Sequence, residues 1–131
     1  LAITIIFKYQ TPNFILILLS LIVSFMVTFN LAYLAGLFCF WIDEFWVTKN
    51  IKDVLILFFS GAVLPYALFP SQVVDLIRYS PFYYSVGMLA RSFQSTVSYQ
   101  DVLIGLLWVL VLGFLIIKVQ KTAITKYSFT A

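Results

Sequence analysis

Few side chains in this sequence have the type and spacing needed for acid–base, nucleophilic or metal chemistry. The chain has no histidine, and Asp43-Glu44 is its only adjacent pair of carboxylates. Neighbouring helical residues point about 100° apart and no second acidic cluster follows, so this pair predicts a solvated helix end rather than a metal or acid–base site. Cys39 is the sole cysteine and lies in an apolar run, which is typical of a small buried hydrophobe.

Nucleophile and phosphate-binding motifs are also missing from the sequence. The serines have no histidine to act as their base, and no lysine stands at motif spacing from them. The glycines never form a phosphate-cradling loop. Gly105 and Gly113 are eight residues apart, a spacing that would allow one helix face to pack closely. We therefore expect no enzyme activity and no cofactor in this chain, with any energy source on another subunit.

The composition indicates an integral membrane protein. Of the 131 residues, 63% are hydrophobic and 10% are charged, and the mean hydropathy is +1.07. A soluble domain needs about 25% charged residues to present a wetted surface. Soluble enzymes and secreted disulfide scaffolds are therefore excluded. The eight Lys and Arg residues are scattered singly and form no basic patch, so membrane lipid is an expected partner and nucleic acid is not.

The first predicted span covers residues 13–42, which contain no charged residue. Thr11-Pro12 precedes it, with threonine placed to cap and proline at the first helical position. At about 1.5 Å per residue the segment is about 45 Å long, whereas a hydrocarbon core is about 30 Å thick. We expect the excess to project into water at the Trp41 end.

The second predicted span covers residues 51–69. The spacing of Asn50 and Asp53 is that of a reciprocal cap, which predicts a helix start near Asn50. Gly61 and Pro65 interrupt the apolar body, and a proline inside a helix removes one backbone hydrogen bond and clashes with the preceding turn. We expect a bend there, lying against other helices or a polar cavity.

Residues 71–95 do not fit a span, because Asp75, Arg78 and Arg91 would each cost about 2.5–3.5 kcal/mol at the bilayer centre. Two short helices fit better: one capped by Ser71, and one from Phe82 to Phe93 that restarts after Ser80-Pro81. An amphipathic pair this short lies in the interface, or enters the membrane and returns on the same side.

The last predicted span covers residues 101–118, opened by a Ser98 and Asp101 cap and followed by a basic tail, residues 118–131. The lysine and arginine distribution sets the orientation. One side receives Lys49, Lys52, Lys118, Lys121 and Lys126, and the other receives Lys8, Arg78 and Arg91. The larger group places the 43–53 loop and the C-terminus in the cytoplasm.

The expected fold is all-α: a polytopic membrane protein with about three transmembrane helices plus a short re-entrant or interfacial helix pair. Residues 1–131 form a single transmembrane domain in this interpretation. Because the chain begins at Leu1 and is apolar up to Phe7, we expect it to be a fragment of a larger membrane protein.

An ordered series of short motifs runs from Phe40 to Phe93. The series is Phe40-Trp41, Phe59-Ser60-Gly61, Pro65, Phe69-Pro70, Ser80-Pro81-Phe82 with Tyr83-Tyr84, and Arg91. In order and spacing it resembles the C-terminal half of the ABC-2 type exporter permeases, in the branch of small six-span permeases without their own nucleotide-binding domain.

The resemblance implies spans four to six of a permease of the bacterial inner membrane. It further implies a homo- or heterodimer of permeases, a separate cytoplasmic ATPase subunit, and export by alternating access. Gly61 and Pro65 would form a bend and gate. The outer re-entrant helices would carry Phe69, Pro70, Asp75, Arg78, Pro81, Phe82 and Arg91. Asp43, Glu44, Lys49 and Lys52 would offer a secondary contact to the cytoplasmic partner.

Other interpretations stay open. Gly61 and Pro65 fit a static kink as well as they fit a gate. A non-transporting membrane scaffold or assembly subunit, whose short helix pair only docks a partner, is the alternative function. A passive channel is a third, although no span carries the polar ladder of a pore lining. The sequence does not identify a transported substrate.

Overall fold

The computed structural model describes residues 13–39, 41–42, 45–59 and 66–130, and within these ranges it contains helices and no strand. The all-α prediction is confirmed for this part of the chain. The helices are α2 (Phe14–Phe38), α3 (Phe45–Phe59), α4 (Ser71–Arg78), α5 (Met88–Ser92) and α6 (Tyr99–Thr130), with a 3-10 turn η1 (Tyr66–Leu68) and a π-helical turn η2 (Tyr83–Gly87).

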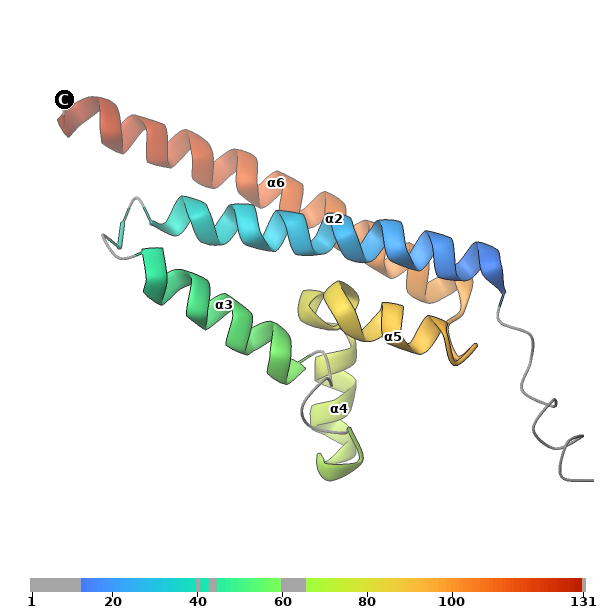
Figure 1. Ribbon diagram of the computed structural model, residues 1–131. Helices are drawn as coiled ribbons and strands as arrows, with labels where there is room; N and C mark the ends of the chain where they lie inside the picture. The colour runs from blue at the N-terminus through green and yellow to red at the C-terminus, as the bar shows by residue number, and fades with distance from the viewer. Residues whose placement is uncertain (1–12, 40, 43–44, 60–65, 131) are drawn as a thin grey trace, which may run out of the picture.

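Two long helices, α2 and α6, lie side by side and run in the same direction (Figure 1). Both are long and apolar enough to cross a membrane, α2 over its full length and α6 over Tyr99–Lys126. They correspond to the first and last predicted spans. Candidate spanning helices are therefore present at two of the three predicted positions.

The bounds of these two helices differ from the predicted spans. α2 ends at Phe38 rather than at residue 42, and the N–H of Cys39 turns back to the carbonyls of Gly36 and Leu37. The length by which this helix exceeds the hydrocarbon core is therefore smaller than predicted. α6 does not end near residue 118 but continues to Thr130, because no glycine or proline follows Gly113.

α6 begins with one half of the predicted reciprocal cap, the half supplied by Asp101. The carboxylate of Asp101 accepts hydrogen bonds from the backbone N–H of Ser98 at 3.0 Å and from its hydroxyl at 3.2 Å. An acidic side chain in the first helical turn also suits the positive end of the helix dipole.

α3 runs opposite to α2, with its start near the C-terminal end of α2 (Figure 1). The predicted start near Asn50 is wrong, because α3 begins at Phe45 and Asn50 lies exposed within it. No proline or glycine separates Phe45 from Asn50, so the helix continues through the capping sequence. The carboxylate of Asp53 pairs instead with Lys52, at 2.8 Å. Gly61 and Pro65, with the predicted bend, lie outside the described residues.

The two short helices predicted for residues 71–95 are present, as α4 and the continuous η2 and α5 segment. Two details of their ends differ from expectation. Pro70, not Ser71, is the cap residue of α4, and its carbonyl accepts the N–H groups of Val73 and Val74. The hydroxyl of Ser80 donates to the carbonyl of Ile77 at 2.7 Å, so it closes α4.

Candidate functional site

The segment formed by η2 and α5 packs against α2, and it provides the most deeply buried side chains outside the two long helices. Tyr83 and Tyr84 are each 2% exposed, and Met88 is fully buried. In Figure 1 the segment lies beneath α2 and extends beyond the end of α3, whereas α4 projects away from the long helices. The helix pair is thus divided into a packed member and a projecting member.

The π-helical turn allows two adjacent tyrosines to be buried together. The N–H of Met88 bonds to the carbonyl of Tyr83, five residues earlier, which widens the turn. The rings of Tyr83 and Tyr84 meet edge to face, with centroids 5.1 Å apart. π-helical turns are rare and often occur at functional sites, so η2 is a candidate functional segment.

An aromatic cluster joins η2 to α3 and η1. The ring of Phe82 stacks on that of Phe59 at 5.7 Å, and the ring of Tyr66 lies 6.3 Å from that of Tyr83. The hydroxyl of Tyr66 donates to the carbonyl of Phe59 at 3.1 Å. Arg91, on α5, donates to the hydroxyl of Tyr83 at 3.3 Å. Two of the predicted outer residues, Phe82 and Arg91, therefore belong to this cluster.

The other predicted outer residues lie around α4. Asp75 and Arg78 are exposed, Pro70 caps the helix, and Pro81 is half-buried just after α4. Phe69 lines an apolar groove of about 360 Å³ between α3 and α4, together with Val54, Leu55, Phe58, Phe59, Val73 and Ile77. Asp75 and Arg78 are thus exposed rather than buried with the cluster, although Arg78 is near enough to Tyr66 and Tyr84 to act on them electrostatically.

α4 is fixed to α6 by one long-range hydrogen bond. The indole Nε1 of Trp108 donates to the carbonyl of Tyr79, at the C-terminal end of α4, at 2.9 Å. Trp108 lies within the uncharged stretch of α6, so the corner between α4 and η2 sits well inside the length of that helix.

A polar seam runs along one face of α2 and contacts η2 through Thr28. We define it as Ser20, Ser24 and Thr28, which recur every four residues and so share one helix face. The hydroxyl of Thr28 donates to the carbonyl of Ser24 at 2.8 Å and lies 3.4 Å from the carbonyl oxygen of Ser85 on η2. Ser20 and Ser24 are 0% and 3% exposed, and their hydroxyls have no hydrogen-bond partner within the described residues.

Expectations from the sequence did not include this seam. Four-residue spacing of small hydroxyl residues inside an uncharged apolar segment is the feature that would have indicated it. Asn30, also on α2, was likewise not expected to link helices; its side-chain Nδ2 donates to the carbonyl of Val109 on α6 at 3.2 Å.

The predicted cytoplasmic contact is described only in part, because Asp43 and Glu44 lie outside the described residues. The ammonium of Lys49 lies 5.6 Å from the centre of the Trp46 ring. Lys52 lines a small cavity of about 180 Å³ between α2 and α3.

The described residues include no group of three or more histidine, cysteine, aspartate or glutamate side chains that could hold a metal ion. Comparisons with family models, curated proteins and solved structures found no match for this chain.

Proposed function

We propose that this chain is a membrane-spanning part of an ABC-type exporter permease, with α2 and α6 crossing the bilayer and the α4, η2 and α5 segment forming its outer gate. The observation that carries the proposal is the polar seam of α2 against the packed member of the helix pair. A separate cytoplasmic ATPase supplies the energy, and the first turns of α3, with Lys49 and Lys52, and the C-terminus face it.

The long helices support the membrane location. In the most apolar 18-residue stretch of each helix, 28% of the residues of α2 and 22% of those of α6 are buried, so most side chains there are open to lipid or to further helices. Phe14, Phe25 and Leu110 are each at least 70% exposed. Large apolar side chains at such exposure suit a hydrocarbon environment.

The seam supports a translocation role over a purely structural one. A buried hydroxyl without a partner costs about 1–3 kcal/mol, and helix pairs in membranes normally satisfy such groups. Two orphan hydroxyls on one face of α2 suit a surface that meets water or polar substrate groups when η2 and α5 move away. A polar group inside a membrane-spanning segment is by default a candidate functional group.

The experiment is to co-purify the full protein from its membrane with its ATPase and to measure ATP-driven export. Substituting Ser24→Leu fills the seam with an apolar side chain and should reduce export several-fold while membrane insertion persists. Gly61→Leu should act similarly if the predicted bend is a gate. Phe25→Leu is the matched control, because Phe25 follows Ser24 in the sequence but lies on the exposed face of α2. This variant should export normally.

Two outcomes would count against the proposal. Unchanged export by the Ser24→Leu protein would show that the seam is not part of the translocation path. A protein that purifies without any ATPase and changes no ATPase activity would instead support the membrane scaffold.

A further inference from the structure

The side of α4 that faces away from the other helices carries both charge and apolar surface. We define this α4 outer face by its exposed residues, Gln72, Asp75, Leu76, Arg78 and Tyr79. Leu76 and Tyr79 are 75% and 65% exposed. In the part of the chain that the structure describes, no ion pair joins Asp75 or Arg78 to each other or to another residue.

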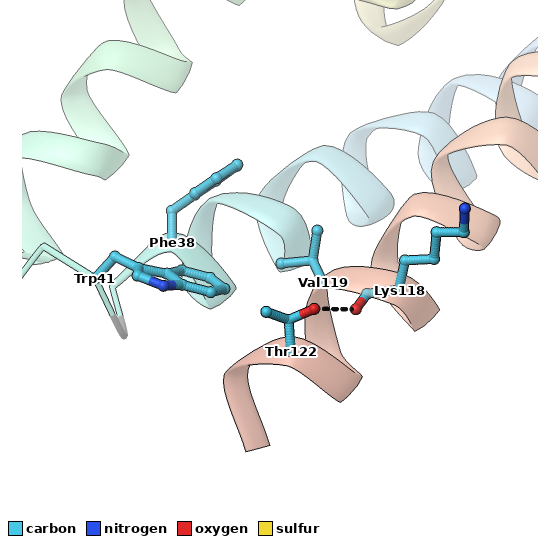
Figure 2. A pocket seen from close by; sticks show the side chains of 5 residues that line it. All are labelled: Phe38, Trp41, Lys118, Val119 and Thr122. Atoms are coloured by element: carbon cyan, nitrogen blue, oxygen red, sulfur yellow. Dashed lines mark hydrogen bonds between the residues drawn. The ribbon is translucent and has the colours of Figure 1, made fainter. Parts of the chain in front are cut away.

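The charged residues of α6 mark the two edges of the hydrocarbon layer. Asp101 and Lys118 bound its uncharged stretch, and at about 1.5 Å per residue they are about 26 Å apart, close to the core thickness of about 30 Å. Lys118 and Trp41 line the same groove, of about 440 Å³, and Figure 2 shows Trp41 beside this end of α6. Tryptophan is typical of the membrane–water interface, which supports Lys118 as one edge and Asp101 as the other.

α4 meets α6 between these two edges. The indole Nε1 of Trp108 donates to the carbonyl of Tyr79, directly after α4, at 2.9 Å. Trp108 follows Asp101 by seven residues, so at about 1.5 Å per residue this bond lies about 10 Å inside the edge marked by Asp101. In Figure 1, α4 runs across the direction of α6 rather than along it. Asp75 and Arg78, in the last turn of α4, therefore lie at a similar depth.

Charges at this depth require partners. Ionisable side chains within a membrane nearly always pair with one another or face water, because exposure to hydrocarbon is unfavourable. The charge of Arg78 acts on the phenols of Tyr66 and Tyr84, but neutral phenols do not complete an ion pair. Leu76, exposed beside Asp75, disfavours a purely aqueous surrounding. The partner must therefore offer both signs of charge and apolar surface.

A second copy of this chain offers all three. Two copies inserted in one membrane have the same orientation, so a two-fold axis that relates them runs along the membrane normal. Because α4 lies across that direction, α4 and its copy run antiparallel when they pack side by side. A pair centred between Leu76 and Ile77 places Asp75 of each copy opposite the partner's Arg78.

We infer that the α4 outer face is a contact surface between two copies of this chain, held by two reciprocal ion pairs between Asp75 and the partner's Arg78 and by apolar contact of Leu76. One symmetry operation forms both ion pairs, so the face is self-complementary. A lipid phosphate would attract Arg78 but repel Asp75, and so it fits only half of the face. The inference rests on the membrane crossing of α6 in the proposed function, but not on export.

Cysteine cross-linking in membranes that contain the full protein tests the contact. Leu76→Cys, in a Cys39→Ala background, places a thiol beside the two-fold axis, and copper phenanthroline should convert this protein to a disulfide dimer. Leu68→Cys is the matched control, because Leu68 is 72% exposed but lies on η1, before the start of α4. An antiparallel pair holds the two copies of Leu68 at opposite ends, so cross-linking should be lost there. Dilution into detergent micelles separates the copies by mass action, so the pairing is measured in the membrane.

Two charge variants in the Leu76→Cys background distinguish pairing between copies from pairing within one copy. Asp75→Lys brings two cations together in a dimer of that variant, and Arg78→Asp brings two carboxylates together in a dimer of the other. In a mixed dimer every facing pair has opposite charges. With a different tag on each variant, the mixed disulfide dimer should exceed either same-variant dimer by about tenfold or more, whereas random association gives about twofold.

Mixed and same-variant dimers in the proportions of random association would overturn the inference. Equal cross-linking of the Leu76→Cys and Leu68→Cys proteins, or cross-linking of the Leu76→Cys protein only to a different protein, would also overturn it. Alkaline extraction of the same membranes reports insertion separately, so release of the Leu76→Cys protein would refute the membrane crossing itself. If a charge variant alone is released, Arg78→Gln gives a second measurement and should reduce the disulfide dimer several-fold; an undiminished dimer would overturn the ion pairs.

Discussion

A Cβ atom placed on Gly105 would lie 2.6 Å from Cγ1 of Val23, closer than two carbon atoms can approach without a shift. It would also lie 3.2 Å from Cδ1 of Tyr84. Gly105 is thus the point at which α6, α2 and η2 meet, and the missing side chain sets how closely the three can pack. Gly113, by contrast, has no such neighbour within 4 Å. The spacing of the two glycines favoured close packing at both, but only Gly105 of the two lies at a close contact between helices.

Gly105→Ala should destabilise the protein, because Val23 is 2% exposed and its branched side chain has little room to turn. Overpacking of this kind costs about 1–3 kcal/mol, against a gain in helix propensity of about 1 kcal/mol. Unfolding of the purified protein in mixed micelles measures the difference.

Gly113→Ala controls for helix propensity, since it gains the same term without a clash, and it should be neutral or slightly stabilising. The double variant Gly105→Ala with Val23→Ala should show positive coupling, because the second change makes room for the first. Strict additivity of the two changes would argue against this contact.

Trp108→Phe should loosen α4 while leaving the long helices intact. The substitution keeps an aromatic ring but removes the donor to the carbonyl of Tyr79, a loss of about 1 kcal/mol. Faster amide hydrogen exchange over residues 71–80, with unchanged exchange in α2, is the expected result. Trp46→Phe is the control, because Trp46 is 71% exposed on α3. Exchange that rises equally in both variants would contradict the link.

Asn30→Leu should weaken the pairing of α2 with α6. It removes the hydrogen bond from Nδ2 to the carbonyl of Val109, and such bonds between membrane helices contribute about 0.6 kcal/mol, with about 1.7 kcal/mol as the upper end. Asn50→Leu changes an exposed amide on α3 and should leave the stability of this pair unchanged. The free energies of unfolding of the Asn30→Leu and Asn50→Leu proteins, measured in the same micelles, test this prediction.

Local features of the fold were predictable where one short interaction decides the outcome. Asp101 caps α6 through Ser98, as their spacing indicates. The turn at residues 93–95 interrupts the helical conformation before Ser98, so α6 cannot begin earlier. Asn50 and Asp53 have the same spacing and fail to cap, since α3 has already begun at Phe45. A capping pattern therefore predicts a helix start only where the preceding residues cannot extend the helix.

Features that join distant parts of the chain were not predictable. The bond between Trp108 and Tyr79 and the contact between Thr28 and Ser85 depend on how the segments pack, and neither residue type nor local spacing specifies the partner. The π-helical turn at Tyr83–Gly87 is similar, because it stabilises the burial of two tyrosines against helices that lie elsewhere in the sequence.

Asp101→Ala should cost about 1 kcal/mol through loss of the cap, since both the N–H and the hydroxyl of Ser98 lose their acceptor. The effect should be confined to the start of α6, where amide exchange of the first turn rises. Asp75→Ala, an exposed carboxylate on α4, is the control and should change neither quantity. A loss of stability in the Asp75→Ala protein as large as in the Asp101→Ala protein would remove the cap as the cause.

The parallel arrangement of α2 and α6 makes a prediction about sidedness. Single cysteines at Asn13, Tyr99 and Lys121, each in a Cys39→Ala background, should react with a membrane-impermeant maleimide from two different sides. Asn13 and Tyr99 lie at the starts of the two helices and should label together from outside the cell, whereas Lys121 should label only after the membrane is opened. Labelling of Asn13 and Tyr99 from opposite sides would contradict the parallel pair, and labelling of all three from one side would show that the helices do not cross.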